Sequence, residues 1–355
     1  MSKRNIIPIF VPHFGCPNDC VFCNQRKITG ASTDISSSDV EKTILEYLSY
    51  FKRKDNVEVA FYGGSFTAIE IEKQRELLEV AKNFKLKGLV NYIRLSTRPD
   101  AINLEILENL KDNLVDIIEL GVQSLDSDVL KLSNRGHNKE VVYEASKLIK
   151  ENGFKLGLQQ MVGLPGDDYE KSIYTAREFV KLNPYCVRIY PTLVIKETAL
   201  NFQYEHGLYK SLDLEESIPI VADILDIYYK NGINVIRVGL QATDNINFDG
   251  DVVAGAFHPA YRQFVESYYI KVALINYFKE SKNLKDEIII KANGKNISNI
   301  SGQKKANKEE IISKLNLKNL KLMEENLDDY TVRILSKREE LIDIRNYYRM
   351  SYKCS

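Results

Sequence analysis

Three of the five cysteines lie within eight residues of one another, in a C-x3-C-x2-C spacing formed by Cys16, Cys20 and Cys23. Soft thiolates gathered in one loop favour a soft metal, either zinc or the iron of an iron–sulfur cluster. A closed zinc site needs four ligands, and no fourth Cys or His follows at the usual short spacing, although His13 could complete a tetrahedron by folding back. Three thiolates on a [4Fe–4S] cluster leave one iron without a protein ligand, which is a place for chemistry. The spacing therefore favours an open iron–sulfur site, with zinc as the alternative.

The composition is that of an ordinary soluble chain with no sign of export. Its 355 residues are 44% hydrophobic, which is typical of a globular protein with a sizeable core. Lys and Arg interrupt every apolar segment before it reaches the roughly 18 residues of a membrane span. The odd number of cysteines and the lack of a signal-peptide layout argue against a disulfide framework. We therefore expect a cytoplasmic protein with no membrane partner.

The formal net charge is zero, but positive charge is concentrated towards the C-terminus. Residues 262–355 contain 19 Lys and Arg residues against 13 Asp and Glu residues. A basic region of this kind is compatible with nucleic acid, and solvated Lys-rich helix faces are the alternative. Lys304, Lys305 and Lys308 crowd together just before a predicted helix.

Strand-like and helix-like patterns alternate through the first half of the chain. The predicted strands cover residues 6–11, 57–62, 92–96, 115–120, 155–161 and 186–190, and the predicted helices cover residues 38–51, 70–83, 101–111, 127–132, 139–151 and 169–182. Six strand–helix units of roughly 30 residues predict a parallel sheet with right-handed crossovers. Since eight strands close a barrel of this type, six strands predict an α/β fold, a partial (β/α)6 TIM-type barrel.

Four chemically distinctive loops follow predicted strands and should meet at one rim of this barrel. They are the cysteine loop, Gly63-Gly64-Ser65, Thr97-Arg98-Pro99-Asp100 and Gly163-Leu164-Pro165-Gly166. In barrels of parallel strands the functional loops lie at the carboxyl ends of the strands. A purely structural metal clip needs none of the other three loops, so their convergence favours an enzyme over a metal-binding module.

The pattern changes after Pro191. Residues 193–235 are mostly helical in pattern, with a long amphipathic helix expected over residues 212–230, a strand over 234–240 and a helix over 261–278. A polar break at residues 281–285 precedes a region with the pattern of strand, helix and strand. We expect a core domain of residues 1–200, a helical extension of residues 201–280 and a C-terminal α+β appendage of residues 281–355.

The cysteine motif, with the aromatic Phe22 before its last cysteine, resembles the signature of the radical S-adenosylmethionine (SAM) superfamily. The resemblance extends to about residue 190, because the order of the loops also fits that superfamily's partial barrel. It implies a [4Fe–4S] cluster held by Cys16, Cys20 and Cys23, with SAM bound to the open iron. Reductive cleavage of SAM would give a 5′-deoxyadenosyl radical that abstracts hydrogen from a substrate. An electron donor such as ferredoxin or flavodoxin is implied as a partner.

The same resemblance implies SAM contacts beside the cysteine loop and at the strand ends. These are Phe22 near the adenine, Gly63 and Gly64 with Ser65 near the methionine amino group, Ser96 and Arg98 near the carboxylate, Gln123 and Ser124 near the ribose or carboxylate, and Gly163 and Leu164 beneath the adenine. Glycines suit this role because a residue without Cβ lets a ligand approach the backbone closely. A rim salt bridge between Arg98 and Asp100, and a simple turn at Gly163, are the alternative interpretations.

Three further phrases resemble the elongator protein 3 family: LGVQS at residues 120–124, NRGH at residues 134–137 and IYPTLVI at residues 189–195. Enzymes of that family use a radical SAM domain and an acetyl-CoA domain to modify wobble uridine in tRNA. Nothing in this sequence has the pattern of the acetyltransferase domain, so the resemblance is to a short member that lacks it. The resemblance implies RNA as the substrate, with a tRNA uridine as the candidate.

Two residues are candidates for direct catalytic contacts. Tyr190 ends the sixth predicted strand, where substrate would enter, and a core aromatic is its alternative role. His137 lies in a loop near the rim, and capping the helix that begins near Lys139 is its alternative role. The sequence thus predicts a radical SAM enzyme acting on RNA. A radical SAM oxidoreductase with a small-molecule or cofactor-precursor substrate, and a non-enzymatic metal-binding module, are the alternatives.

Overall fold

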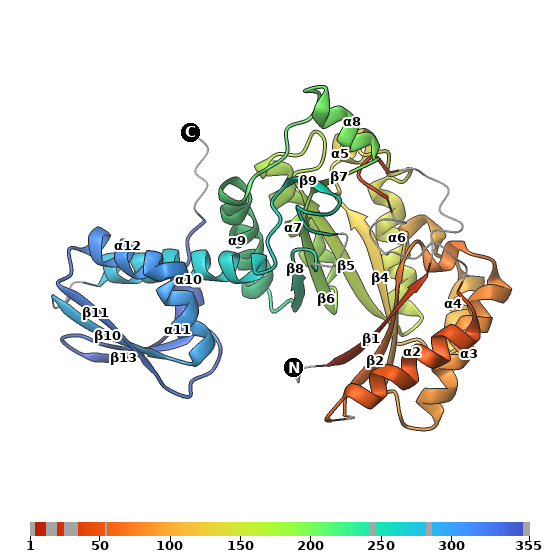
Figure 1. The fold of residues 1–355 in the computed structure, drawn as a ribbon, viewed down its shortest axis with the longest axis horizontal. Coiled ribbons are helices and arrows are strands. Elements are labelled where there is room, and N and C mark those ends of the chain that lie inside the picture. The colour runs from red at the N-terminus through yellow and green to blue at the C-terminus, as the bar shows by residue number, and fades with distance from the viewer. Residues whose placement is uncertain are drawn as a thin grey trace.

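A curved sheet of seven parallel strands forms the larger part of the molecule. The computed structural model describes residues 4–11, 20–24, 35–53, 55–241, 246–281 and 286–350. The strands stand in the order β1-β2-β3-β4-β5-β6-β8, and each neighbouring pair is parallel. Figure 1 shows helices covering the outer side of this sheet, which curls into a half-barrel whose edge strands are β1 and β8.

Strands and helices alternate through the half-barrel, as parallel strands with crossover connections require. The elements are β1 (Asn5–Val11), α2 (Ser37–Tyr50), β2 (Val57–Gly63), α3 (Ile71–Leu86), β3 (Tyr92–Thr97), α4 (Leu104–Asp112), β4 (Ile117–Gln123), α5 (Ser127–Leu132), α6 (Lys139–Glu151), β5 (Lys155–Val162), α7 (Tyr169–Leu182), β6 (Cys186–Pro191), β7 (Leu193–Ile195), α8 (Ala199–Glu205), α9 (Leu214–Lys230), β8 (Val235–Val238), β9 (Val252–Gly255) and α10 (Tyr261–Glu280). Short 3-10 turns follow β2 at Phe66–Ala68 and β3 at Pro99–Ala101.

The predicted partial barrel with a C-terminal α+β unit is confirmed, but its sheet has seven strands and not six. The sequence predicts the last strand, at residues 234–240, yet assigns it to the helical extension because a mostly helical stretch separates it from β6. In the structure α9 returns the chain to the sheet, and β8 pairs with β6 through Val187–Val235 and Arg188–Arg237. A second difference is the short strand β7, which pairs with β9 where the sequence pattern is helical.

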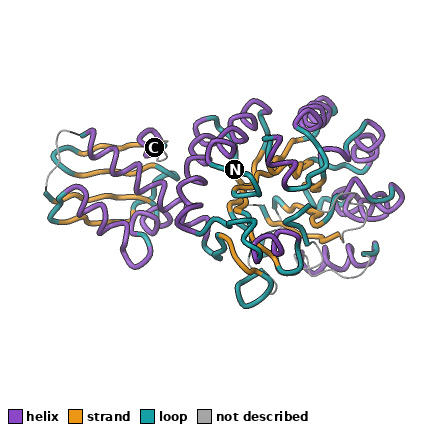
Figure 2. Tube along the Cα trace, turned by 90° about the horizontal axis from the view of Figure 1, so that it is seen from above, coloured by secondary structure: helices purple, strands orange, loops and turns teal. Residues whose placement is uncertain are grey.

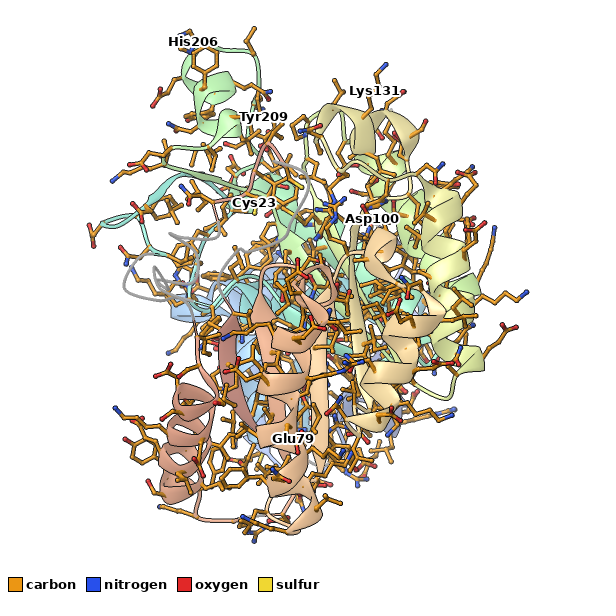
Figure 3. The ribbon with its side chains drawn as sticks, turned by 90° about the vertical axis from the view of Figure 1, so that its right-hand side faces the viewer. Cys23, Glu79, Asp100, Lys131, His206 and Tyr209 are labelled. Atoms are coloured by element: carbon orange, nitrogen blue, oxygen red, sulfur yellow. The ribbon has the colours of Figure 1, made fainter. Side chains whose placement is uncertain are left out.

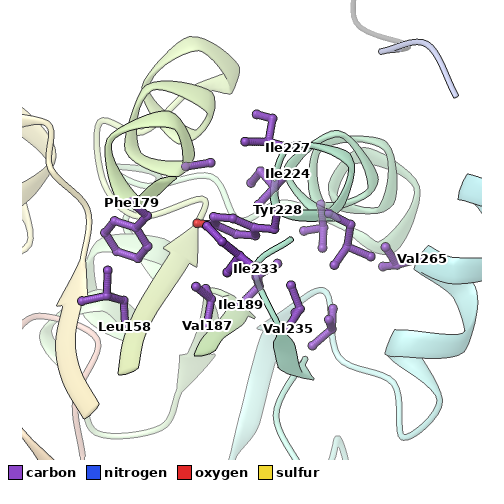
Figure 4. Close-up of a cluster of buried hydrophobic side chains, with 14 of the residues drawn as sticks. Leu158, Phe179, Val187, Ile189, Ile224, Ile227, Tyr228, Ile233, Val235 and Val265 are labelled. Carbon is purple, nitrogen blue, oxygen red and sulfur yellow. The ribbon is translucent and has the colours of Figure 1, made fainter. Parts of the chain in front are cut away.

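The strands of the half-barrel alternate apolar and polar residues, so the two faces of the sheet differ. The apolar residues face the helices: Leu158, Val187 and Ile189 belong to the same buried cluster as Phe179 of α7 and Tyr228 of α9 (Figure 4). Burying such a side chain contributes about 1.5–3 kcal/mol. The residues between them face the hollow of the half-barrel, where the polar groups described below lie.

A smaller unit lies beside the half-barrel and is joined to it by the long helix α10 (Figures 1 and 2). Its elements are β10 (Glu287–Ala292), α11 (Gly294–Ser301), α12 (Ala306–Leu315), β11 (Asn319–Glu324), β12 (Thr331–Leu335) and β13 (Glu339–Asp343), with 3-10 turns at Gln303–Lys305 and Ile344–Tyr347. The four strands form a sheet in the order β11-β10-β12-β13. The sequence predicts one strand after α12 where the structure has three, because charged residues dilute the pattern of these short strands. Among the described residues, no helix is long and apolar enough to cross a membrane.

Candidate active site

A cavity of about 110 Å³ lies at the carboxyl ends of β2, β3 and β4, beside the described cysteine turn, and is also lined by Arg135 and by Gln159 from within β5. Its lining residues are Cys20, Phe22, Cys23, Gly63, Gly64, Ser65, Ser96, Thr97, Arg98, Gly121, Gln123, Arg135 and Gln159. Nine of them are residues that the sequence assigns to the cluster or to SAM. Figure 3 shows Cys23 and Asp100 at the same end of the half-barrel. Cys16, the first predicted ligand, lies outside the described residues.

The described part of the cysteine loop is a turn held from both sides. The N–H of Cys23 donates to the carbonyl of Cys20 at 2.9 Å, which closes the turn. Val21 donates to the Ser133 carbonyl at 3.2 Å, and its own carbonyl accepts from Leu200 at 2.7 Å. Backbone hydrogen bonds to the end of α5 and the start of α8 therefore fix this loop. Phe22 packs beside Val21 in a small apolar cluster.

Two buried guanidinium groups lie against the sulfur of Cys20. Arg135 donates from Nη1 to Cys20 Sγ at 3.0 Å, and Arg98 approaches the same sulfur at 3.9 Å. Arg98 also forms the ion pair with Asp100 that the sequence leaves open, at 2.8 Å from Nε and 2.9 Å from Nη2. Arg135 is held in turn by the carbonyl of Gly121, which accepts from its Nη2. Hydrogen bonds to sulfur and nearby charge are the levers by which proteins tune iron–sulfur clusters.

The glycine pair after β2 has a structural reason to lack side chains. Gly63 has a φ of +113°, and a Cβ added there would lie 2.2 Å from the carbonyl oxygen of Val11. The next N–H, of Gly64, donates to that same carbonyl at 3.2 Å. The pair thus brings β1 and β2 together at the point where the cysteine loop begins, while both residues line the cavity. The two glycines therefore allow β1 and β2 to pack closely and also leave space for a ligand in the cavity.

Two further predicted SAM contacts at the cavity differ in their hydrogen bonding: Ser65 is held by neighbouring residues, whereas the side-chain oxygen of Gln123 accepts no hydrogen bond from the described residues. Ser65 Oγ lies 2.8 Å from the Thr97 hydroxyl and accepts from the Arg98 N–H at 3.1 Å, so it ties two rim loops together. Gln123 has a φ of +74° at a bulge between β4 and β5. Its Oε1 is buried and accepts no hydrogen bond from the described residues. A strained backbone that presents an unpaired amide is a usual feature of functional sites.

Three predicted SAM contacts do not line this cavity. Ser124 is buried and accepts from the Asp126 N–H at 3.1 Å, as part of the connection to α5. Gly163 and Leu164 line a different, larger cavity of about 660 Å³, in which the Tyr209 hydroxyl donates to the Gly163 carbonyl at 2.6 Å. In that loop, burial raises the pKa of Asp167 to about 6, although Asp167 accepts from the Gly163 N–H at 2.8 Å.

The two predicted catalytic residues also lie outside this cavity. His137 lines a third cavity, of about 760 Å³, and burial together with Arg135 lowers the pKa of His137 to about 4. The helix-capping role considered for His137 belongs to Asn138, whose Oδ1 accepts from the Val141 N–H at 3.1 Å. Tyr190 is close to Arg188, whose Nη1 donates to its hydroxyl at 3.4 Å.

Sequence reasoning missed Gly121 and Gln159, which line the cavity from within β4 and β5. A signal was present for Gln159, because it is a polar residue at a hollow-facing position of an alternating strand. Its Nε2 donates to Glu119 at 3.1 Å and lies 3.4 Å from the Ser96 hydroxyl. Gln159 thus connects the cavity to the charged residues of the hollow.

Buried ion pairs cross the hollow from strand to strand. Glu58 pairs with Arg4 and, at 2.7 Å, with Nε of Arg94. Glu119 pairs with Arg94 and, at 2.7 Å, with Nε of Arg188. Burial acts to raise the pKa of Glu119, but Arg188 and Arg94 outweigh it and lower this pKa to about 2. The hollow is therefore a charged interior that stays ionised at neutral pH.

Comparison with known proteins assigns this arrangement to a family. The radical SAM superfamily model matches residues 10–178, and the radical SAM C-terminal domain model matches residues 184–271. The chain belongs to the radical SAM superfamily. Its half-barrel is that of a radical SAM enzyme, and that superfamily uses a [4Fe–4S] cluster and SAM.

Several curated proteins are similar to this radical SAM chain. An uncharacterized protein of Methanocaldococcus jannaschii, MJ0486, is 30% identical over 63% of this chain and 67% of its own length. A tRNA uridine(34) acetyltransferase of Methanocaldococcus infernus is 31% identical over 47% of this chain and 35% of its own length. The heme chaperone HemW of Lactococcus lactis is 24% identical over 70% of this chain and 66% of its own length. The chain spans from about a third to two thirds of the length of these relatives.

The fold also matches a solved structure. An archaeal Elp3 of Methanocaldococcus infernus with an N-terminal deletion superposes with a TM-score of 0.60 at 22% identity, over 79% of this chain and 68% of that one. The match shows that the two chains share their fold. Elongator complex protein 3 of Homo sapiens is 31% identical over 48% of this chain and 35% of its own length. The predicted similarity to elongator protein 3 is thus confirmed by sequence, and the shared fold agrees with it.

Proposed function

We propose that this radical SAM enzyme modifies RNA and that its target is a uridine of tRNA. The observation that carries the proposal is the shared cavity, where Cys20 and Cys23 meet the glycines of the β2 loop, Arg98 and Gln123. The relatives named tRNA uridine(34) acetyltransferase and Elongator complex protein 3 supply the substrate class. Because the chain spans about a third to a half of their length, acetyl transfer is left out of the proposal.

The residues around the cavity fit a cluster and SAM. Cys16, Cys20 and Cys23 would hold the cluster, and three soft sulfur ligands suit iron. Gln123 Oε1 and Arg135 Nε are buried and have no hydrogen-bonding partner among the described residues, so a polar ligand finds groups to meet there. When bound, the cluster and SAM together supply a carbon-centred radical that takes a hydrogen atom from the substrate.

The chain's own residues prepare the site for this chemistry. Arg135 donates to the sulfur of Cys20 and fixes the ligand's orientation. Gly63 and Gly64 keep side chains out of the space beside the cysteine turn. Gln159, held by Glu119, presents an amide at the wall that faces the rest of the hollow.

Positive charge in the smaller unit supports RNA as the substrate. Lys304 and Lys305 are exposed and lie in a turn of positive φ, and Lys308 follows within α12. If these lysines are part of an interface with three to five phosphate contacts, tRNA binding should depend on salt through counterion release. Raising the salt from about 50 to 200 mM should then weaken tRNA binding roughly tenfold to a hundredfold. Loss of that salt dependence after all three are changed to Ala would support the contact. Binding that does not change would remove this unit from the RNA interface.

The function itself is tested by product analysis. Anaerobically reconstituted protein, reduced and supplied with SAM and unmodified tRNA, should yield a uridine of altered mass together with 5′-deoxyadenosine, both measured by mass spectrometry. Cys20→Ala should lose the cluster and both products, whereas Cys186→Ala, a buried thiol within β6, should keep them. Unaltered tRNA nucleosides in the presence of a competent cluster would contradict RNA modification.

A small-molecule or cofactor-precursor substrate is the second candidate, favoured by the match to the heme chaperone HemW. That relative aligns with a larger share of this chain than the tRNA uridine(34) acetyltransferases do. Heme binding by the purified chain, measured by absorbance, together with no binding of tRNA at low salt, would favour this candidate. Binding of tRNA without heme would favour the first.

A further inference from the structure

A row of polar side chains lies in the hollow, and of its members only Gln159 lines the cavity assigned to the cluster and SAM. Gln159 of β5, Arg188 of β6 and Arg237 of β8 are register partners on three neighbouring strands. Register partners on parallel strands point to the same face and are separated by about 4.8 Å. Gln159 lines the cavity that contains Cys20, and β8 is the edge strand of the sheet. This row of side chains therefore leads from the cavity to the open side of the half-barrel.

The row carries positive charge that the described residues leave only partly neutralised. Arg188 pairs with Glu119 at 2.7 Å, but that carboxylate is shared with Arg94. Arg237 forms no ion pair with any described carboxylate, and its one hydrogen bond there runs from Nε to the Gly239 carbonyl at 3.0 Å. Burial and then the charge of Arg188 lower the pKa of Arg237. Like charges on neighbouring strands destabilise a sheet unless an anion joins them.

Two tyrosine hydroxyls add further donors beside these arginines. Arg188 donates to Oη of Tyr62 at 2.7 Å and to Oη of Tyr190 at 3.4 Å. Because each oxygen accepts from Arg188, each hydroxyl must direct its own proton elsewhere, and neither finds an acceptor among the described residues. Burial raises the pKa of Tyr62 to about 12, so its hydroxyl keeps the proton at neutral pH. The terminal N–H groups of Arg237 and the two hydroxyls are donors that no described acceptor satisfies.

We infer that Arg237, with Arg188, Tyr190 and Tyr62, binds a phosphate group of the substrate. A positively charged surface that presents only donors selects an anion, and a planar guanidinium matches phosphate oxygens with two parallel hydrogen bonds. The four terminal N–H groups of Arg237 and the two tyrosine hydroxyls outnumber the roughly four acceptor sites of a carboxylate, which favours phosphate. A phosphate held at Arg237 lies two strand spacings, roughly 10 Å, from Gln159 at the cavity. The site would anchor the substrate beside the place where the radical forms.

This inference rests on the proposed function in one respect, namely that the reaction takes place in the cavity that contains Cys20. It does not require RNA, because the phosphate can belong to an RNA backbone or to a phosphorylated small molecule. Both sources share the chemistry that the donors recognise, and they differ in whether the phosphate is a diester or a terminal group.

The test measures binding of three probes to the reconstituted full chain by ligand-observed NMR. The probes are uridine 5′-monophosphate, the dinucleotide uridylyl-uridine, which has one phosphodiester, and uridine, which has no phosphate. We expect uridine to bind at least about tenfold more weakly than the better phosphate probe, since it lacks the charge-assisted hydrogen bonds. Arg237→Gln should weaken that probe roughly tenfold to a hundredfold, and Tyr190→Phe should weaken it a few-fold. Lys147→Gln, which removes an exposed charge on α6, is the matched control and should change nothing.

Each outcome decides between the possibilities. If uridylyl-uridine is the better probe, the phosphate comes from an RNA backbone; if the monophosphate is, it comes from a terminal phosphate. Uridine that binds as well as either phosphate probe, or an Arg237→Gln variant that binds like the original chain, would overturn the inference. Tyr190→Phe keeps the test decisive if Arg237→Gln fails to fold. Phosphate binding that depends on Arg237, together with unaltered tRNA nucleosides, would contradict the proposed function while leaving this site in place.

Discussion

Neighbouring residues in each strand of the half-barrel lie in opposite environments. Leu120 points to the helices and is fully buried among apolar side chains, whereas Glu119, one residue earlier, points to the hollow and pairs with two arginines. Parallel sheets usually bury apolar residues on both faces. Here the second face carries charges whose desolvation costs free energy, and that same face ends at the cavity with Cys20. The difference indicates that one face of the sheet stabilises the fold and the other face is reserved for chemistry.

The largest expected effect comes from breaking the charged face. Glu119→Gln would leave Arg94 and Arg188 buried without their shared carboxylate, which costs about 3–5 kcal/mol of unfolding free energy. Leu120→Ala is the matched change on the other face and costs about 2–5 kcal/mol through a lost contact and a cavity. Urea denaturation at pH 7 measures both. A Glu119→Gln variant as stable as the original chain would show that the ion pairs contribute nothing to the fold.

The stability costs of the substitutions on the two faces should depend differently on pH. The pKa of Glu119 is lowered to about 2 in the folded chain, below its unfolded value, so its contribution is present above pH 4.5 and is lost as pH falls towards 2. The stability difference between the original chain and Glu119→Gln should therefore shrink over that range. The cost of Leu120→Ala should stay constant, since no titrating group is removed. Parallel pH dependence in both variants would contradict this assignment.

A smaller loss of stability is expected from a substitution at Gly63, the last residue of β2. Gly63→Ala places a Cβ 2.2 Å from the Val11 carbonyl in a backbone conformation of positive φ, which should cost about 1–3 kcal/mol and weaken SAM binding. Gly88 also has a positive φ, of +73°, but a Cβ added there meets nothing within 4 Å, so Gly88→Ala is the control and should cost less, about 1 kcal/mol. Thermal unfolding and equilibrium binding of SAM measure the two effects. If both substitutions lowered the unfolding free energy equally, the close approach of β1 would not explain why residue 63 is a glycine.

The smallest expected effect concerns the cluster itself. Arg135→Gln removes a positive charge and a hydrogen-bond donor from the sulfur of Cys20. Because both stabilise the more negative, reduced state of the cluster, the midpoint potential should fall. A fall of about 59 mV corresponds to a tenfold change in the one-electron equilibrium. Arg135→Lys keeps the charge and should lie between the two, and Arg75→Gln, on α3, is the control. Redox titration followed by EPR gives the potentials, and identical values in all four proteins would remove Arg135 from this role.

The sequence was enough to predict the half-barrel and most of the cavity, because both follow from local patterns. Period-two and helical spacing locate the strands and helices, and the rule that loops meet at the carboxyl ends of parallel strands brings Cys20, Gly64 and Gln123 together. What it could not supply was register. The place of β8 in the sheet depends on a crossover through α9, so the pairing of Arg188 with Arg237 is invisible before the sheet is assembled.

The remaining differences have the same origin. Arg135 lies on the loop after α5, and only tertiary packing brings it to the sulfur of Cys20. Gly163 follows β5 as expected, but the approach of Leu212 and Tyr209 encloses it in a separate cavity. Sequence patterns therefore located the ends of five predicted strands to within one residue but ended β4 three residues early, and long-range contacts decided which strand ends share a site.

The most direct test of this account is the EPR spectrum of the reduced, reconstituted protein with and without SAM. A cluster held by three cysteines leaves one iron open, so we expect a [4Fe–4S] signal that changes shape when SAM is added. Cys23→Ala, at the cavity, should lose the signal, and Cys186→Ala, within β6, should retain it. Tight zinc binding without iron, or an iron–sulfur signal that SAM leaves unchanged, would contradict the claim that this face of the sheet ends in a radical SAM site.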